Sequence, residues 1–351
     1  MIDAEFLKEW YDNGVLNYKG GCGMPIRLGT IGTNFITERF LDAISKIADY
    51  ELSAIYSRTN DRAEQFAQAH GAKHTYTSLD DLATSDYVDA VYIASPTSFH
   101  AEQTELMLKH GKHVIVEKPA ASSYKEWESM SELAHANQVV LMEAMKTTQL
   151  PNFSILKQSL NKLGPIRSGF ANYCQYSSRY DAFKNGQVLN AFKPEYSNGS
   201  LMDIGVYGIY PVIALFGRPD EVKAQGHMLE SGVDGAGSLL LKYKESQIII
   251  NHSKITNSKL PSEIQGEHGN VVIENWNDFH TLTLYDRNQA TQTTISTDQH
   301  NNPMYYEAVE FASLIKEQKL ESVDNSHKNT AITLQVLDEA RRQIGLVFPN
   351  D

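Results

Sequence analysis

The sequence predicts an α/β protein in which a doubly wound parallel sheet is followed by an α+β domain built on a mainly antiparallel sheet. Between Ile26 and Glu143, short apolar or β-branched runs alternate with helical patterns, which is typical of a parallel sheet. The segment Val88–Ala94 is mostly apolar without alternation, as expected for a strand buried on both faces. After Pro151, strand-like runs follow one another without long helices between them, which indicates the second domain.

Six strands and five helices alternate in the predicted first domain. The strands are expected at Ile26–Leu28, Leu52–Tyr56, His74–Tyr76, Val88–Ala94, His113–Glu117 and Val139–Glu143. The helices are expected at Thr37–Ala48, Asp61–His70, Leu79–Ala83, Ala101–His110 and Ser122–Asn137. Asp61 at the start of one helix and Gly111 after the end of another are the expected terminal signals.

The predicted second domain begins with helices and continues with strands. Helices are expected at Phe153–Leu163, Ser200–Phe216, Tyr305–Glu317 and Thr330–Ile344. Strands are expected at Ser238–Tyr243, Gln247–His252, Asn270–Glu274 and Thr281–Tyr285. We therefore divide the chain into an N-terminal extension (1–24), a first domain (25–146), a second domain (147–329) and a C-terminal helix (330–351) that packs back on the first domain.

The composition excludes several classes of protein. The 351 residues carry 31 Lys and Arg against 43 Asp and Glu, a net charge of −12, whereas binding the nucleic-acid backbone requires a basic surface. No apolar run approaches the roughly 20 residues that span a bilayer. Two cysteines, Cys22 and Cys174, are too few for a disulfide framework and fit a reducing compartment. We expect a cytoplasmic protein with no nucleic-acid or membrane partner.

Residues 1–24 form an extension without the basic start, apolar centre and small-residue cleavage site of a signal peptide. An ordinary flexible tail is one interpretation. Alternatively, Lys19-Gly20-Gly21 can be encoded by a purine-rich run that resembles a bacterial ribosome-binding site, a few codons before Met24. We hypothesise, for a bacterial source, that Met24 is the native start. Peptides from residues 2–20 in mass spectrometry of the native protein would contradict this.

A glycine-containing turn links the first predicted strand to the first helix. Glycine is needed where the backbone turns sharply beside a pyrophosphate, whose charge the helix N-terminus attracts. Asn34 occupies the third glycine position of the usual fingerprint, so an ordinary strand-to-helix turn is the alternative. The candidate dinucleotide-binding residues here are Gly29, Thr30, Ile31, Gly32, Thr33, Asn34 and Phe35.

The end of the second predicted strand bears on which dinucleotide binds. An Asp or Glu there would accept hydrogen bonds from the ribose 2′-hydroxyl and favour NAD, but the chain has Ser57 and Arg58. A hydroxyl and a guanidinium suit a 2′-phosphate. We therefore expect NADP as the preferred cofactor and NAD as the second option; a solvated Arg58 at a helix start is the alternative.

Polar residues follow the fourth and fifth predicted strands, and the carboxyl ends of strands hold the ligands of open α/β sheets. Lys118 follows a mostly apolar strand, and Pro119 restricts the backbone from which the Lys118 side chain leaves. The alternatives are a surface lysine and, for His100, a helix-start residue packed on the sheet. The cofactor-binding candidates here are Ala94, Ser95, Pro96, Thr97, His100, Glu117 and Lys118, together with Lys146 after the sixth strand.

The predicted helix over Ser200–Phe216 is apolar nearly all round, as a buried helix is. Its single carboxylate, Asp203, needs a partner if it is buried. Tyr207 lies four residues further on, on the same helix face. Gly205 and Gly208 flank Tyr207 and indicate that another group approaches closely. The alternative is that Asp203 caps a neighbouring segment.

In this order the motifs resemble the Gfo/Idh/MocA family of oxidoreductases. The motifs are the Gly29–Asn34 turn, Pro96–His100, Glu117–Pro119, Met142–Ala144 and Asp203–Tyr207. The resemblance covers about residues 25–348 and implies an N-terminal Rossmann domain and a C-terminal domain whose open sheet mediates oligomerisation, as a dimer or a tetramer. Tyr207 stands where many sugar dehydrogenases of the family carry His. In having Tyr at this position, the chain is similar to the branch of dimeric dihydrodiol and D-xylose dehydrogenases, which use NADP.

The resemblance implies hydride transfer between nicotinamide C4 and a hydroxyl-bearing carbon, with Lys118 and Tyr207 meeting across the domain cleft. We assign Tyr207 as the acid/base and expect the Lys118 ammonium to lower the Tyr207 pKa from its ordinary value of about 10. Asp203 would orient one of them or a substrate hydroxyl, and His100 would lie near the nicotinamide. No metal is required by this chemistry.

The expected substrate is a sugar, a polyol or a vicinal diol. Tyr176, Arg179 and Tyr180, with Tyr173 and Lys193, precede the catalytic helix and could line a cleft for such a molecule, a sheet face or an ordinary loop being the alternative. A rival function is a non-catalytic dinucleotide-sensing regulator, since some repressors share this fold without the catalytic residues. The presence of both the Lys and the Tyr argues against that rival.

Overall fold

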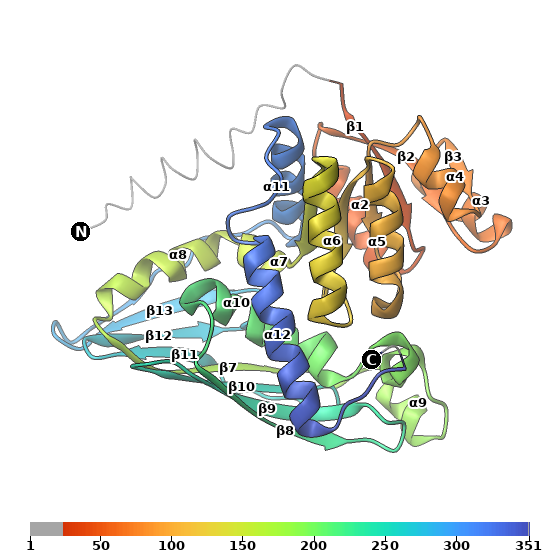
Figure 1. The fold of residues 1–351 in the computed structure, drawn as a ribbon. Helices are drawn as coiled ribbons and strands as arrows, with labels where there is room; N and C mark the ends of the chain where they lie inside the picture. Colours follow the sequence, from red (N-terminus) through yellow and green to blue (C-terminus); the bar gives the residue numbers. More distant parts are fainter. Residues whose placement is uncertain (1–23, 350) are drawn as a thin grey trace.

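The computed structural model describes residues 24–349 and 351, so the extension before Met24 lies outside the described residues. The first domain is a six-stranded parallel sheet with strand order β3-β2-β1-β4-β5-β6, flanked by helices (Figure 1). Its strands are β1 (Ile26–Ile31), β2 (Tyr50–Tyr56), β3 (His74–Tyr76), β4 (Ala90–Ile93), β5 (His113–Glu117) and β6 (Leu141–Ala144). Its helices are α2 (Phe35–Ile44), α3 (Asn60–His70), α4 (Leu79–Thr84), α5 (His100–Lys109), α6 (Tyr124–Asn137) and α7 (Lys146–Gln149).

Burial on both faces explains why the central strands read as apolar runs. Every residue of β4 and of β6 is buried, as in other sheets covered by helices on both faces. Phe40 of α2 stacks on Tyr92 of β4 with ring centroids 3.9 Å apart. Helix α11 (Met304–Lys316) adds Phe311 to this core and packs against α2. Although the sequence assigns 147–329 to the second domain, α11 therefore lies on the first.

The second domain contains an eight-stranded sheet in the order β14-β13-β12-β11-β7-β10-β9-β8. Only β7 and β10 pair in parallel; the other neighbours are antiparallel. The strands are β7 (Ile166–Cys174), β8 (Glu221–Met228), β9 (Asp234–Lys242), β10 (Gln247–Ser253), β11 (Ser262–Gly266), β12 (Gly269–Glu274), β13 (Thr281–Asp286) and β14 (Thr291–Thr294). Helices α8 (Pro151–Ser159) and α9 (Tyr180–Lys184) belong to the same domain. The predicted fold class is confirmed.

Four of these strands have no counterpart among the predicted ones: β7, β8, β11 and β14. The edge strands show why. All four residues of β14 are exposed, and β8 at the other edge is mostly exposed. Exposed edge strands carry polar side chains and are held by backbone pairing with a neighbour, so they lack the apolar pattern that identifies a strand.

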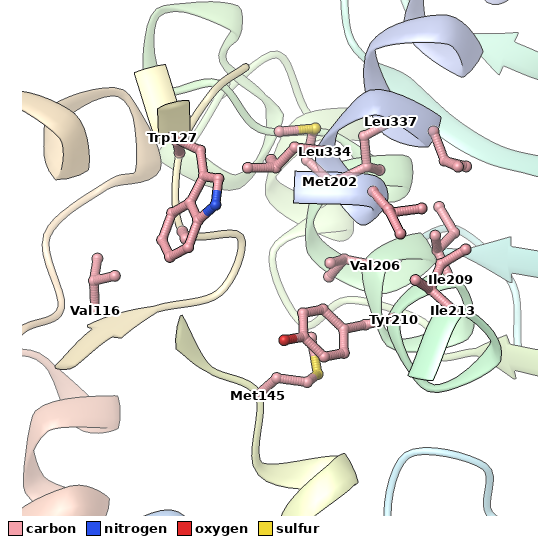
Figure 2. Close-up of a cluster of buried hydrophobic side chains, with 14 of the residues drawn as sticks. Val116, Trp127, Met145, Met202, Val206, Ile209, Tyr210, Ile213, Leu334 and Leu337 are labelled. Carbon is pink, nitrogen blue, oxygen red and sulfur yellow. The ribbon is translucent and has the colours of Figure 1, made fainter. Parts of the chain in front are cut away.

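The two domains share an apolar cluster around α10 (Val206–Phe216) and α12 (His327–Ile344), shown in Figure 2. Trp127 from α6, Tyr210 from α10 and Leu337 from α12 are all fully buried members of this cluster. Helix α12 contacts α6 of the first domain and α10 and β8 of the second. The C-terminal helix, which was expected to pack back on the first domain, therefore lies against both domains.

One segment, Pro194–Phe216, is helical enough, long enough and apolar enough to cross a membrane by length and composition. This differs from the expectation that no apolar run reaches that length. Within the protein, 72% of its most apolar window is buried. Burial of this extent is typical of the core helix of a folded domain, and α10 forms the C-terminal 11 of the 23 residues of the segment.

Candidate active site

A cleft of about 1730 Å³ lies between the carboxyl ends of β4, β5 and β6 and the second domain. Its lining comes from both domains, so that neither domain alone forms the site. Among the predicted site residues, those that line it are Asn34, Phe35, Ala94, Ser95, Pro96, Thr97, His100, Glu117, Lys118, Lys146, Arg179, Asp203 and Tyr207. Gly29, Thr30, Ile31, Gly32, Thr33, Ser57, Arg58, Tyr176 and Tyr180 do not line it.

The turn after β1 brings the backbone against β4. Gly32 has φ +115°, and a Cβ there would lie 2.8 Å from the Ala94 carbonyl oxygen, so only glycine fits. Asn34, in the third glycine position, caps α2: its Oδ1 accepts from the Ile36 amide at 2.9 Å, and its Nδ2 donates to the Ala94 carbonyl at 2.7 Å. The tight turn at the start of α2 is a feature that fits a dinucleotide pyrophosphate, although the Asn34 side chain occupies the Ile36 and Thr37 amides at the N-terminus of this helix.

Arg58 is exposed after β2, and a second arginine that the sequence analysis missed lies nearby. Arg62, in the first turn of α3, donates from Nε to Thr33 Oγ1 at 3.0 Å and from Nη2 to the Thr33 carbonyl at 2.5 Å. Arg58 precedes Thr59, the residue before α3, so only Arg62 belongs to the helix. The signal in the sequence that could have identified Arg62 is a second guanidinium group close after the end of the second strand.

Lys118 and Asp203 form an ion pair across the cleft. Lys118 Nζ lies 2.7 Å from Asp203 Oδ1 and also donates to the Asp203 carbonyl oxygen at 3.1 Å. Burial acts to lower the pKa of Lys118, but the charges of Asp203 and Glu117 outweigh it and raise that pKa. Lys118 is therefore a stable ammonium group.

A second lysine completes this arrangement. Lys254, directly after β10, has Nζ 2.9 Å from Asp203 Oδ2 and is almost fully buried. Burial alone would raise the pKa of the Asp203 carboxyl, but Lys118 and Lys254 together hold it well below its usual range. Lys254 also donates to the Ala191 carbonyl and to Asn198. No local pattern marks Lys254, because its partner is 51 positions away in the sequence and they meet only in the fold.

Tyr207 projects into the cleft from α10, partly buried between two cations. The centre of its ring is 4.8 Å from Lys118 Nζ and 5.7 Å from Lys146 Nζ. Tyr173 packs against it edge-on, with ring centroids 5.6 Å apart. Burial, followed by the negative charge of Glu117, raises the pKa of Tyr207 well above its ordinary value. The expectation of a lowered pKa is wrong for this state, because burial and the nearby carboxylates outweigh the effect of the Lys118 ammonium.

His100 is buried at the start of α5 and connects two loops. Its Nε2 lies 2.8 Å from the Ser95 carbonyl oxygen and its Nδ1 lies 3.0 Å from the Pro119 carbonyl oxygen. Burial lowers the pKa of His100 to about 4, so the ring is neutral and can donate to one of the two carbonyls. His100 thus positions the loops after β4 and β5, the second of which carries Lys118.

Two buried carboxyl groups lie beneath the cleft. Glu117 Oε1 accepts from the Tyr92 hydroxyl at 2.7 Å. Glu307 of α11 is fully buried, and neither of its carboxyl oxygens has a partner among the described residues. Burial, followed by the Glu117 charge, raises the pKa of Glu307 well above its usual range, which favours its neutral form. The sequence analysis missed Glu307, which reaches the cleft only because α11 packs on the first domain.

Lys146, at the start of α7, is held by the second domain. It forms an ion pair with Asp278 and donates to the Asn277 carbonyl at 3.0 Å. Because Lys146 also faces the Tyr207 ring, it contributes to the reacting end of the cleft. The sequence analysis assigned Lys146 to the cofactor alone.

The two glycines beside Tyr207 serve the packing of α10. A Cβ on Gly208 would lie 2.5 Å from Ile250 Cγ2, and one on Gly205 would lie 3.3 Å from His252. Both neighbours belong to β10, so the group that approaches closely is the second sheet. Asp203 itself lies in a π-helical turn, Leu201–Gly205, that precedes α10. Such turns widen the helix locally and are frequent at functional sites.

Of the three candidate substrate residues, Arg179 lines the cleft, whereas Tyr176 and Tyr180 lie outside it. Tyr173 lines the cleft as well. Tyr176 and Tyr180 instead pack edge-on against each other with ring centroids 5.5 Å apart, and the Tyr176 hydroxyl donates to Asp181 at 2.7 Å. The cleft wall also includes amide side chains that the sequence analysis did not select: Gln175, Asn190, Asn198 and Asn277.

Comparison with known proteins gives two family matches. The model described as the oxidoreductase family with an NAD-binding Rossmann fold, GFO_IDH_MocA, matches residues 26–145. The model for the GFO/IDH/MocA C-terminal domain matches residues 159–272. Together these two segments account for more than half of the chain.

Curated relatives are similar over nearly their full length. One is scyllo-inositol 2-dehydrogenase (NADP(+)) IolU of Bacillus subtilis (strain 168), 52% identical over 326 residues that cover 93% of this chain and 99% of that protein. Another is trans-1,2-dihydrobenzene-1,2-diol dehydrogenase of Danio rerio, 28% identical over 343 residues, with 93% of this chain and 99% of that protein covered.

Solved structures share the fold. A 3-ketoreductase from Actinomadura kijaniata, in complex with TDP-benzene and NADP, superposes with a TM-score of 0.77 at 23% identity, covering 91% of this chain and 98% of that one. Levoglucosan dehydrogenase, in complex with NADH and levoglucosan, gives a TM-score of 0.82 at 18% identity, with 92% and 98% covered. With both of its domains matched, the chain belongs to the Gfo/Idh/MocA family of oxidoreductases.

Proposed function

We propose that this protein is an NADP-dependent dehydrogenase that transfers a hydride between nicotinamide and a hydroxyl-bearing carbon of a cyclic polyol, a sugar or a vicinal diol. The observation that carries the proposal is the Lys118–Asp203 ion pair beside Tyr207, in a cleft at the carboxyl ends of the parallel strands. The relative that is 52% identical, scyllo-inositol 2-dehydrogenase (NADP(+)), supports a cyclic polyol in particular.

The residues of the first domain fit the cofactor. Gly32 allows the tight turn against Ala94 that precedes α2, and the cleft continues along Ala94 to the reacting end at Lys118. Arg58 and Arg62 supply two guanidinium groups near the end of β2, where a ribose 2′-phosphate would lie. When bound, the nicotinamide ring supplies the hydride or accepts it.

The chain's own residues handle the proton. The raised pKa keeps the Tyr207 hydroxyl protonated, which suits donation of a proton to a carbonyl oxygen during reduction. In oxidation the Tyr207 hydroxyl would first release its own proton to solvent. The resulting phenolate, favoured by the two ammonium groups that flank its ring, would then take the proton from the substrate hydroxyl. Lys118 uses two donors on Asp203, and its third N–H remains to orient the substrate oxygen.

The cleft wall suits a polyhydroxylated substrate. Its amide side chains, together with Arg179 and Tyr173, offer hydrogen-bond donors and acceptors in the same cleft as Tyr207. A polyol presents hydroxyl groups in several directions, and each needs a partner when water is displaced. Oligomerisation through the eight-stranded sheet and a cytoplasmic location stay predictions from the sequence.

The test is a spectrophotometric panel with purified protein. Inositol isomers, aldoses and vicinal diols are each incubated with NADP and with NAD, and absorbance of the reduced nicotinamide is followed. We expect turnover with at least one cyclic polyol and a lower Michaelis constant for NADP than for NAD. Cofactor binding without turnover of any substrate would favour the regulatory alternative and reject the proposed enzyme.

A further inference from the structure

A cluster of three potential metal ligands lies outside the cleft. His135 comes from the last turn of α6, Glu321 from the segment before α12, and His327 is the first residue of α12. One ligand atom from each of the three lies within 4.8 Å of the others. None of the three lines the cleft or takes part in the proposed reaction.

The hydrogen bonds of His327 fix which of its nitrogens is free to bind a metal. Its Nε2 lies 2.9 Å from the Leu141 carbonyl oxygen, which can only accept, so Nε2 carries the hydrogen. The lone pair is therefore on Nδ1, and this atom faces His135 Nε2 at 3.3 Å. A metal-bound histidine commonly donates its other ring N–H to a backbone carbonyl, as His327 does here.

The spacing of the two nitrogens matches a tetrahedral site. For Zn–N bonds of about 2.0–2.1 Å at the tetrahedral angle, two imidazole nitrogens lie about 3.3–3.4 Å apart. The Glu321 carboxylate is oriented by its Oε2, which accepts from the His327 amide at 2.6 Å. Its other oxygen makes no hydrogen bond among the described residues and can complete a third position.

The His327 ring is held rigidly on its buried side. Trp127 packs edge-on against it, with ring centroids 5.5 Å apart, and the Trp127 indole N–H donates to the His327 carbonyl at 3.2 Å. The His135 side of the site is open to solvent, which gives an ion a path of entry.

We propose that His135, Glu321 and His327 form a site for a divalent transition-metal ion, Zn²⁺ being the ion that the ligand set and spacing favour, with solvent as the fourth ligand. Two imidazoles and one carboxylate disfavour Mg²⁺ and Ca²⁺, which prefer sites made of oxygen. The ion connects α6 of the first domain to the N-terminus of α12, which also packs on the second domain. Its role is to stabilise the junction between the domains.

The test uses the full-length protein with any polyhistidine tag removed and metal stripped by a chelator. Zn²⁺ is titrated calorimetrically, and Co²⁺ is added separately because its visible spectrum distinguishes tetrahedral from octahedral coordination. We expect one Zn²⁺ per chain, weaker binding at pH 5.5 because the imidazoles must be deprotonated, and a Zn²⁺-dependent rise in Tm.

Variants locate the binding. His135→Ala and Glu321→Gln should each weaken Zn²⁺ binding on the order of tenfold or more, and should remove the Tm rise. His110→Ala, an exposed histidine at the end of α5, is the matched control and should bind as the wild type does. Dehydrogenase activity should be unchanged in all three variants, because their cleft is intact.

Equal Zn²⁺ affinity of the wild type and His135→Ala, or an octahedral Co²⁺ spectrum, would overturn the proposal. The two imidazoles would then be joined by an ordinary hydrogen bond from His135 to His327. Because these measurements do not depend on the dehydrogenase reaction, their failure would leave the proposed function untouched.

Discussion

Lys118 Nζ lies 2.7 Å from Asp203 Oδ1, although the two residues are 85 positions apart in the sequence and belong to different domains. The ion pair holds the Lys118 ammonium beside the Tyr207 ring, and the Asp203 carboxylate offsets part of the positive charge of Lys118. Lys254 on the other carboxylate oxygen leaves the three-residue group with one net positive charge. The site therefore offers Tyr207 a modest cationic environment, whose effect on the pKa is outweighed by burial.

Replacing Tyr207 by Phe should remove the proton donor and leave the ring packing in place. We expect kcat to fall roughly 100- to 10,000-fold, the range contributed by a positioned acid or base. The dissociation constant of NADPH, measured by fluorescence, should change little. Tyr173→Phe, on the neighbouring ring, is the control and should retain much more activity. Near-normal turnover of Tyr207→Phe would refute the assigned role.

Replacing Lys254 by Met should act through Asp203. The variant loses one cation of the ion-pair group and leaves the Asn198 and Ala191 acceptors without their donor. We expect a loss of about 1–3 kcal/mol in the free energy of unfolding, measured with urea, since Asp203 is 40% exposed and partly solvated. We also expect lower kcat, because the Asp203 carboxylate would shift toward Lys118. Unchanged kcat and stability together would show that Lys254 has no part in the site.

Cofactor preference should depend on both arginines near β2. Arg58→Ala and Arg62→Ala should each raise the Michaelis constant for NADP on the order of tenfold and leave that for NAD nearly unchanged, because only NADP carries the 2′-phosphate. Kinetics with both cofactors provide the measurement. Equal effects on the two cofactors would mean that the arginines support the turn at Thr33 and do not contact a phosphate.

Glu143 should make stability fall as the pH rises. Burial raises its pKa from 4.5 to about 7 in the folded protein, so the folded state binds a proton that the unfolded state has already lost between these values. The stability that this bound proton contributes is fully present below about pH 4.5 and is lost as the pH rises to 7. It amounts to a free energy of unfolding on the order of 2–4 kcal/mol.

Glu143→Gln tests this directly. The amide oxygen of Gln can still accept from the Ala120 amide, the bond that Glu143 Oε1 makes at 3.1 Å, but the side chain no longer titrates. Urea unfolding at pH 5 and pH 8 should therefore show a smaller loss of stability in the variant than in the wild type. Parallel pH profiles for the two proteins would contradict the raised pKa.

Gly208→Ala should destabilise the second domain. The added Cβ would lie 2.5 Å from Ile250 Cγ2, which forces α10 away from β10 and costs about 1–3 kcal/mol. Combining it with Ile250→Ala should cost less than the sum of the two single changes, because the new methyl group enters the space that Ile250 vacates. Thermal unfolding of the wild type, the two single variants and the double variant provides this double-mutant cycle. If the two losses of stability simply add, the close contact is contradicted.

The sequence by itself determined the parallel sheet and most of the cleft-lining residues of the first domain. Strands buried on both faces are recognisable as apolar runs, and the turns at their carboxyl ends are local in sequence. Asp203 was identifiable because a carboxylate within an apolar helix needs a partner, and Tyr207 because it lies four residues further on, on the same face of that helix. The exposed edge strands β8 and β14 could not be identified from the sequence, because backbone pairing with a neighbouring strand holds them in place without an apolar pattern.

The tertiary structure decided which partners these residues have. Lys254, Glu307 and Arg62 reach the site through packing between segments far apart in the chain. The direction in which the pKa of Tyr207 is shifted could not be predicted from the sequence either, because it depends on the balance between burial and all surrounding charges. Local patterns record which residues are buried, but the identity of a buried charge's partner is a property of the assembled fold.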